Sequence, residues 1–308
     1  MPGPDPAAPG GGPAAPRDQA APGTDRSAPG AGPPAPAAAP AAPRDGSGGA
    51  QGASGPDADA LALLLAAAGE AGRIALSYWR RSPPSREKPG GAGPVSDADL
   101  AVDRFLRETL LAARPGTAWL SEETPDDPAA RRAADECWIV DPIDGTRPFL
   151  AGEPDWNVSA ALTRGGRPVA AVVHLPARGE TYAATRGGGA VLNGAPLRAE
   201  APAGPPRLLA SRQSMAPARW PRGVPDATLH WRHALAWRFC LVAAGRYDAL
   251  LTHRPAWYWD VCAGSLVAAE AGCTVTDLAG RPLAFDAEHP QTPGAVAAPA
   301  ALHPALIP

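Results

Sequence analysis

The sequence predicts an α+β fold, in which helices and antiparallel strands occupy separate layers. Two observations support this fold class. Apolar side chains recur at helical spacing over residues 57–81 and again downstream of Ser96. The apolar period then changes to two over 156–163, 168–175 and 180–185. The connections between these strands are too short for a parallel crossover, so we expect the strands to pair antiparallel.

The first helix can be capped by Asp57 or Asp59, and Pro83-Pro84 stops it. A loop rich in Gly and Pro follows and contains Lys88. Ser96 opens the second helix, where Ser96-Asp97-Ala98-Asp99 matches a capping box. Pro115-Gly116 closes this helix. The N-terminal part of the fold is therefore expected to be a pair of amphipathic helices.

The strands of the middle region are followed by a less regular C-terminal half. Two short apolar strands, at 118–120 and 137–140, each run into acidic residues. An Asn193-Gly194 pair marks a later turn. The C-terminal half is expected to contain a helix over 234–245, a strand over 247–252, a helix over 260–271 and a hairpin turning near Ala279-Gly280. We find no internal repeat.

The first 56 of the 308 residues differ in composition from the rest, because 42 of them are Pro, Ala or Gly. Such a segment cannot bury enough apolar surface to offset the entropy of ordering. We expect residues 1–56 to be a disordered tail with polyproline II character, or alternatively a partner-docking arm. The tail has no signal-peptide or transit-peptide pattern. Residues 57–308 suffice for one large domain or two fused lobes.

Charge, hydropathy and cysteine usage exclude several classes of protein. With 28 Lys+Arg against 31 Asp+Glu, the net charge of −3 does not favour binding to a nucleic-acid polymer. We find no apolar run of about 18 residues, so no membrane span is expected. The cysteines are scattered without a C-x-x-C pair, which predicts reduced core thiols in a cytoplasmic protein. They are Cys137, Cys240, Cys262 and Cys273.

Acidic residues stand at strand ends and at a helix start. Glu122 with Glu123 follows one strand, Asp141 and Asp144 follow another, and Asp260 begins an Ala-rich helix. Mg²⁺ prefers oxygen ligands and takes one or two carboxylates per ion. Four carboxylates brought together could hold two Mg²⁺ ions, an arrangement that clamps a phosphoryl group. The pattern therefore indicates metal-assisted phosphate chemistry.

The residues that follow Asp141 fit the same chemistry. Gly145 and Thr146 would let the backbone approach a phosphate, and the Ile143 carbonyl could be a further metal ligand. Structural alternatives stay open at this point. Asp-Pro and Asp-Gly are also common in turns, Asp260 could be a helix cap, and Asp99 is accounted for by the capping box.

Four motifs in order make the chain resemble the inositol monophosphatase superfamily of Mg²⁺-dependent, lithium-sensitive phosphomonoesterases. The motif D-P-[IL]-D-G-T-x-x-F stands at 141–149, and W-D-x-A-[AG] with a later E-A-G stands at 259–264 and 270–272. The acidic pair preceded by a small residue is 121–123, and the T-x-x-D element with its upstream lysine is Ser96, Asp99 and Lys88. The match extends from about residue 60 to about residue 285.

This resemblance implies a layered α-β-α-β-α sandwich with largely antiparallel sheets. It also implies two or three Mg²⁺ ions, a small phosphorylated substrate and a possible homodimer. The implied ligands are Glu122, Asp141 and the Ile143 carbonyl for the first ion, and Asp141, Asp144 and Asp260 for the second. The implied catalytic residues are Glu122, Asp99 and Thr146, with Thr146 bonded to Asp99 and orienting water. The resemblance implies that Gly145 and Thr146 donate backbone N–H groups to the phosphate, and we expect Asp260, Lys88 and Arg238 to contact the substrate as well. A second phosphate or an adenine could be contacted by Arg238, Arg232, His233, Arg254 or Trp257.

The substrate expected from the resemblance is 3′-phosphoadenosine 5′-phosphate, hydrolysed to AMP. Segments 120–123 and 238–243 are similar to those of bacterial 3′(2′),5′-bisphosphate nucleotidases. Inositol-specific members usually carry a Gly-Ser pair where this chain has residues 234–236, and a Glu where it has His253. Inositol phosphate, histidinol phosphate and fructose bisphosphate remain alternatives, as does a non-catalytic binding protein. A serine hydrolase has no support, because no G-x-S-x-G setting occurs.

Overall fold

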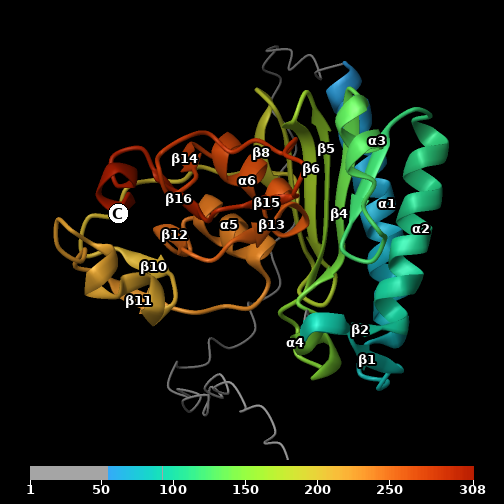
Figure 1. The fold of residues 1–308 in the computed structure, drawn as a ribbon, viewed down its shortest axis with the longest axis horizontal. Helices are drawn as coiled ribbons and strands as arrows, with labels where there is room; N and C mark the ends of the chain where they lie inside the picture. The colour runs from blue at the N-terminus through green and yellow to red at the C-terminus, as the bar shows by residue number, and fades with distance from the viewer. Residues whose placement is uncertain (1–54, 92) are drawn as a thin grey trace, which may run out of the picture. The chain divides into compact units, whose positions relative to one another are not determined.

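In the computed structural model, which describes residues 55–91 and 93–308, two N-terminal helices cover one face of a large sheet (Figure 1). They are α1 (Pro56–Tyr78) and α2 (Asp97–Ala113). The predicted capping of α1 by Asp57 or Asp59 is wrong, because both lie inside the first turn and Gly55 occupies the cap without a side-chain bond. Carboxylates in a first turn still interact favourably with the helix dipole. The expected tail over 1–56 lies outside the described residues except for its last two.

By length and composition α1 is long and apolar enough to cross a membrane, whereas no membrane span is expected from the sequence. Core helices of globular proteins pass the same test. Here Ala60, Leu64, Ala68 and Ala75 are buried in a cluster shared with α2 and the sheet. The apolar composition of α1 is thus explained by burial on one side, against protein.

The large sheet contains seven strands within the described residues, and their order in space follows the chain. All neighbours pair antiparallel, as predicted, except β3 and β4, which are parallel. A parallel pair needs a crossover, and α3 (Pro128–Ala133) lies in that connection. The strands are β3 (Ala118–Ser121), β4 (Glu136–Asp144), β5 (Asn157–Arg164), β6 (Arg167–Leu175), β7 (Glu180–Thr185), β8 (Gly189–Leu192) and β9 (Ala195–Pro196).

A bulge near the end of β4 positions both of its aspartates. Asp141 pairs with Ser159 and Asp144 pairs with Asn157, so three steps on β4 match two steps on β5. Without the extra residue, positions three apart would point to opposite faces of the sheet. The bulge brings the two carboxylates to the same side, and it also accommodates Pro142, which cannot donate to the ladder.

The other face of the seven-stranded sheet is covered by α5 (Leu235–Ala243) and α6 (Tyr258–Glu270), which pack in turn on a second sheet (Figure 1). Its described strands lie in the order β11-β10-β12-β16-β14. They are β10 (Arg207–Leu209), β11 (Thr228–His230), β12 (Ala249–Thr252), β14 (Cys273–Thr276) and β16 (Ala295–Pro299). The predicted hairpin near Ala279-Gly280 is reduced to a turn with one bridge, because β14 pairs with β16 instead.

The layers confirm the predicted α-β-α-β-α sandwich. Two details differ from the prediction: the second sheet is not purely antiparallel, and the last helical layer consists of short 3₁₀ helices. The second sheet is mixed, since β10 is parallel to both β11 and β12. Its outer face packs with short 3₁₀ helices in a cluster that includes Met215 and Leu306. These helices are η2 (Arg212–Met215), η3 (Pro217–Arg219) and η4 (His303–Leu306).

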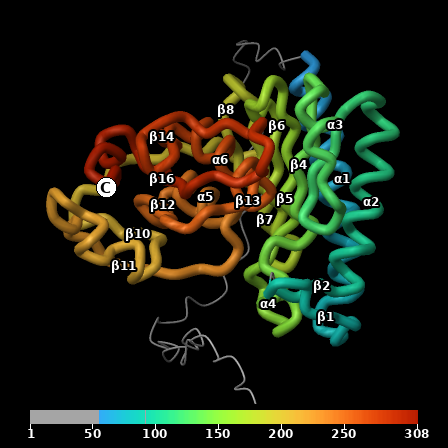
Figure 2. The backbone as a smooth tube through the Cα atoms, viewed as in Figure 1, coloured from blue at the N-terminus to red at the C-terminus, as the bar shows by residue number. Residues whose placement is uncertain are grey.

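Several short helices and strands lie outside the two large sheets. Helix α4 (Thr146–Leu150) contacts β2 (Pro94–Ser96), and both views show them side by side at one end of the sheet (Figures 1 and 2). Strand β2 pairs with β1 (Ser85–Glu87) across η1 (Pro89–Gly91). A separate pair joins β13 (Ala256–Trp257) to β15 (Gln291–Thr292) ahead of α6.

Candidate active site

Three carboxylates from two distant segments converge on one cavity. Asp141 and Asp144 come from the end of β4, and Asp260 comes from the first turn of α6. One oxygen of each lies within 4.8 Å of the others. The cavity, of about 210 Å³, is lined by these three residues and by Glu122. The structure therefore brings all four predicted carboxylates to one place, with three of them in direct proximity.

Burial and mutual repulsion make the ionised cluster costly. Burial, Glu122 and Asp144 raise the pKa of Asp141 well above its ordinary value. Burial, Asp144 and Glu122 do the same to the pKa of Asp260. Burial raises the pKa of Asp144 to about 6, and hydrogen bonds from Asn157 and from the backbone of Ala236 oppose that rise. Such a cluster is favourable in the ionised state only when positive charge is supplied.

The residues fit divalent cations on the chemistry of their donors. The three carboxylates offer converging, buried oxygen atoms, which are the ligands that Mg²⁺ prefers. Glu122 lines the same cavity and could complete a second site. The Ile143 carbonyl lies 3.3 Å from the Thr146 hydroxyl, beside the same loop. The predicted Mg²⁺ ligands remain a prediction, and their arrangement is compatible with it.

Lys88 supplies a positive charge at one edge of this group. Its Nζ donates to Glu122 Oε1 at 2.6 Å and to Glu123 Oε1 at 2.7 Å. Burial alone would lower the pKa of Lys88, but Glu122 and Glu123 raise it. Burial also raises the pKa of Glu123 to about 7 despite its bond to Lys88, because one ammonium cannot neutralise two carboxylates. The predicted contact of Lys88 with substrate is untested.

Thr146 and Asp99 are joined as the resemblance implies. Thr146 Oγ1 donates to Asp99 Oδ1 at 3.1 Å, and both residues are buried. The other oxygen, Asp99 Oδ2, accepts from the backbone N–H of Ser96 at 2.8 Å and from its hydroxyl at 2.5 Å. Asp99 thus closes the capping box of α2 with one oxygen and holds the Thr146 hydroxyl with the other. Burial raises the pKa of Asp99 even against these bonds.

Gly145 is required by the backbone between the aspartates and α4. Its φ is +99°, and a Cβ there would lie 2.9 Å from the carbonyl oxygen of Asp155. A larger residue would be strained and would also clash with the chain. Gly145 and Thr146 both line the cavity.

The start of α5 is bound to a carboxylate of the cluster, a contact that no sequence pattern predicts. Asp144 accepts from the backbone N–H of Leu235 at 3.2 Å and of Ala236 at 2.9 Å. These donors follow Ala234, whose φ is +61°, an uncommon conformation for a residue with a Cβ. Asn157 Nδ2 also donates to Asp144, at 3.1 Å. Asp144 therefore fixes the start of α5.

Asp103 supports the loop that carries Glu122, and it is not among the residues predicted from the sequence. It is buried on α2 and accepts from the hydroxyls of Ser121 and Thr124. These bonds fix the loop after β3 that presents Glu122. A signal was available, because Asp103 interrupts the apolar face of α2 between Val102 and Leu106. A carboxylate on a buried helix face needs a partner.

Arg238, like the predicted residues Asp99, Ile143 and Lys88, does not line the carboxylate cavity, and neither does His253. Arg238 is 8% exposed, its guanidinium stacks on Trp231 at 3.7 Å, and its Nε donates to the Arg232 carbonyl at 2.6 Å. Burial lowers the pKa of Arg238 to about 10, against the effect of Asp144. Its predicted contact with substrate is untested. His253 packs against Trp220, and neither of its buried ring nitrogens has a partner among the described residues.

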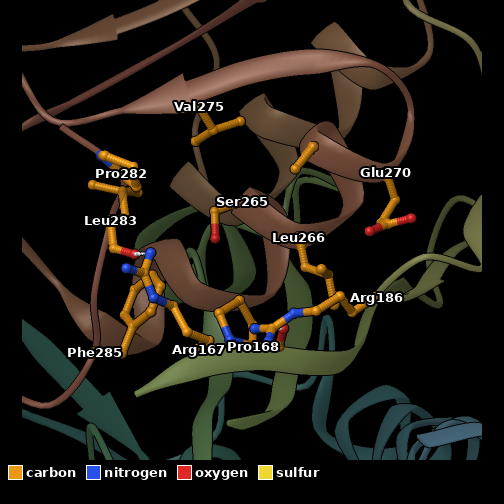
Figure 3. A pocket seen from close by; sticks show the side chains of 11 residues that line it. Arg167, Pro168, Arg186, Ser265, Leu266, Glu270, Val275, Pro282, Leu283 and Phe285 are labelled. Atoms are coloured by element: carbon orange, nitrogen blue, oxygen red, sulfur yellow. Dashed lines mark hydrogen bonds between the residues drawn. The ribbon is translucent and has the colours of Figure 1, made fainter. Parts of the chain in front are cut away.

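A second cavity, of about 360 Å³, lies between the start of β6 and α6 (Figure 3). Leu266 and Phe285 are among its apolar lining residues, and Arg167 donates to the Leu283 carbonyl at 3.0 Å. Glu270 of the E-A-G motif also lines it and accepts from the backbone of the β7–β8 turn at Gly187. None of the predicted site residues lines this second cavity. Glu270 therefore binds the β7–β8 turn and does not line the carboxylate cavity.

Fold and site together agree with a family match over residues 58–308, which is to the inositol monophosphatase family. The chain belongs to this family, whose members are phosphatases.

All four cysteines are free and buried, as predicted.

Several relatives with different substrates in their names are similar to this chain. Inositol-1-monophosphatase of Rhizobium meliloti is 39% identical over 62% of this chain and 74% of its own length. Histidinol-phosphatase of Chlorobaculum parvum is 31% identical over 74% and 89%, and the 3′(2′),5′-bisphosphate nucleotidase CysQ of Escherichia coli is 32% identical over 62% and 79%. The solved structure of a Thermotoga maritima IMPase superimposes with a TM-score of 0.70 at 26% identity, covering 81% of this chain and 95% of its own.

Proposed function

We propose that this protein hydrolyses a small phosphate monoester with Mg²⁺ held by Glu122, Asp141, Asp144, Asp260 and the Ile143 carbonyl. The observation that carries the proposal is the convergence of three buried carboxylates within 4.8 Å beside Gly145 and Thr146. When bound, the cations would neutralise these carboxylates, lower the pKa of a coordinated water and stabilise charge on the phosphoryl group.

The side chains of the protein supply the orientation of the attacking water. When Thr146 Oγ1 donates its proton to Asp99 Oδ1, at 3.1 Å, the lone pairs of the hydroxyl are available to accept a hydrogen bond from water. Asp99 has a raised pKa, so it is a better proton acceptor than an exposed aspartate. The Ser96 bonds keep Asp99 in this orientation. Gly145 and Thr146 offer their backbone to the phosphate.

For the substrate we propose a 3′(2′),5′-bisphosphate nucleotide, as the resemblance of 120–123 and 238–243 to bisphosphate nucleotidases suggests. Inositol phosphate is the second candidate, favoured by the 39% identical relative. Against it, the expected Gly-Ser pair is replaced around Ala234, and the expected Glu is His253, which is packed against Trp220.

A substrate panel tests both levels of the proposal. Phosphate release would be measured with Mg²⁺ and with chelator on 3′-phosphoadenosine 5′-phosphate, inositol 1-phosphate, histidinol phosphate and fructose 1,6-bisphosphate. We expect chelator-sensitive release, with the highest kcat/KM on the first. A higher kcat/KM on another ester would overturn the substrate, and release unaffected by chelator would overturn the metal-dependent site.

We also propose that residues 57–308 carry the activity and that the tail is dispensable for it. Deleting residues 1–54 retains Gly55, which caps α1. The truncated protein should keep kcat/KM within about twofold, and a loss beyond about tenfold would show that the tail takes part. We propose a cytoplasmic location because the cysteines are free. We propose a homodimer because the chain resembles the family. Light scattering after size-exclusion chromatography would test the dimer.

A further inference from the structure

A guanidinium stands at the rim of the carboxylate cavity. Arg147 follows Thr146 in α4 and lines the cavity together with Gly93 and His233. Its two terminal nitrogens lie 3.8 and 3.9 Å from the point that a Cβ on Gly93 would occupy. The guanidinium thus lies over the turn between β1 and β2, at van der Waals distance from the Gly93 position.

Arg147 differs from the other arginines around the site in having no partner. Within the described part of the chain, no hydrogen bond or ion pair joins its side chain to another residue, and the side chain is exposed. Arg238, in contrast, is buried under Trp231 and bonded to a backbone carbonyl. Arg178 is paired with Asp155. Arg147 is therefore the arginine whose donors remain available to a ligand in the cavity.

The charge balance of the cavity indicates what such a ligand would carry. Four carboxylates line it, and two divalent cations would neutralise them, so the charge of Arg147 is not needed for that purpose. A phosphomonoester held beside Gly145 and Thr146 would extend from a cavity whose rim is cationic. A guanidinium offers a planar fork of N–H donors that matches phosphate oxygens.

We propose that Arg147 determines specificity by binding a second phosphate of the substrate, distinct from the phosphate that is hydrolysed. The proposal rests on the proposed phosphatase function. In this proposal the contact with the second phosphate comes from Arg147, which lines the cavity, and not from Arg238, which was predicted from the sequence. Because the contact is to a group that does not react, its effect belongs mainly in KM rather than in kcat.

The test compares Arg147→Gln with the unmodified enzyme on matched substrates in saturating Mg²⁺. Adenosine 3′,5′-bisphosphate and adenosine 3′-monophosphate differ only in the second phosphate. Inositol 1,4-bisphosphate and inositol 1-phosphate form a second pair. Loss of a charge-assisted hydrogen bond, on the order of 1.5–3 kcal/mol, corresponds to about 10- to 150-fold in affinity. We expect kcat/KM of Arg147→Gln to fall by this factor for at least one bisphosphate, through a higher KM. For the matching monophosphate we expect kcat/KM to fall less than about threefold.

Controls make the outcome specific to this side chain. Arg147→Lys keeps the positive charge but loses the planar fork of donors. Its kcat/KM for the bisphosphate should lie between those of the unmodified enzyme and Arg147→Gln. Arg107→Gln removes another exposed arginine, on α2, and should leave kcat/KM unchanged for both members of each pair. Equal losses on both members of each pair would place Arg147 on the scissile phosphate and overturn the proposal, as would no loss on either. Failure of the unmodified enzyme to release phosphate from any ester would instead overturn the proposed function on which the inference rests.

Discussion

Asp141 concentrates the electrostatic cost of the site in one residue. It is 2% exposed and faces three other carboxylates, so its ionised form is disfavoured unless cations are bound. The same repulsion that destabilises the metal-free protein is what would make metal binding favourable. Function and stability are therefore opposed at this position.

Asp141→Asn should abolish Mg²⁺-dependent phosphate release, by at least about 100-fold, because a shared anionic ligand is lost. The metal-free variant should at the same time be more stable, on the order of 1–3 kcal/mol at pH 7.5, because a buried like charge is removed. Urea denaturation in chelator measures the second effect. Asp127→Asn is the matched control, since Asp127 caps α3 and asparagine caps equally well. Full activity in Asp141→Asn would contradict the site.

Thr146→Ala removes the hydroxyl that donates to Asp99. We expect kcat to fall about 100-fold, in the range for lost proton-transfer catalysis, with little change in the Mg²⁺ concentration for half-maximal activity. Thr146→Ser retains the hydroxyl and should recover most of the rate. Steady-state kinetics over a Mg²⁺ titration separate the two effects. A serine variant as slow as the alanine variant would show that the hydroxyl is not the reason.

At the scale of elements, the caps of helices are also parts of the site. The N-terminus of α2 is closed by Ser96 and Asp99, and Asp99 then reaches Thr146. The N-terminus of α5 is held by Asp144, a carboxylate of the cluster. Each cap therefore links the position of a helix to the position of a side chain that the proposed chemistry uses.

Ser96→Ala should cost about 1 kcal/mol of stability through the lost cap, and it should also lower kcat because Asp99 is less well oriented. Ser96→Thr keeps the hydroxyl and should restore both. Thermal unfolding and initial rates on the same preparations provide the comparison. A change in stability without any change in rate would separate the cap from the proposed catalytic function of Asp99.

Across the whole molecule, the site lies where three layers meet: α2 on one side of the sheet, the end of β4 within it, and α5 and α6 on the other side (Figure 1). Its raised carboxylate pKa values link the stability of the entire fold to pH. Between the ordinary pKa near 4 and the folded values of about 6 for Asp144 and about 7 for Glu123, the folded protein holds more protons than the unfolded chain. The free energy of unfolding must then fall as pH rises through this window.

The metal-free protein should therefore lose stability between pH 5 and pH 7.5, on the order of 2 kcal/mol for each such carboxylate. Mg²⁺ should oppose the loss, with a stabilisation that grows with pH, because it binds the ionised form. Urea unfolding at several pH values with Mg²⁺ and with chelator measures both slopes. Stability that stays constant or increases with pH in chelator would show that the carboxylates are not repelling one another.

Local regularities of the sequence determined much of the fold. Strands β5, β6 and β7 follow a period of two and lie within one or two residues of their predicted bounds, and α2 begins at its capping box. The last sheet was poorly predicted, because β10, β11 and β16 are short and their pairing partners are distant in the chain. Short apolar strands give little periodicity to detect.

The sequence by itself determined which chemical groups this protein brings to its site, because motifs such as residues 141–149 fix the residue types and their local turn. Only the tertiary structure decided how those groups meet. A bulge in β4 turns Asp141 and Asp144 to one side, Asp103 holds the loop of Glu122, and Arg147 rather than Arg238 lines the cavity. The physical reason is that side-chain direction and burial depend on register and on packing between layers, which residue order alone does not specify.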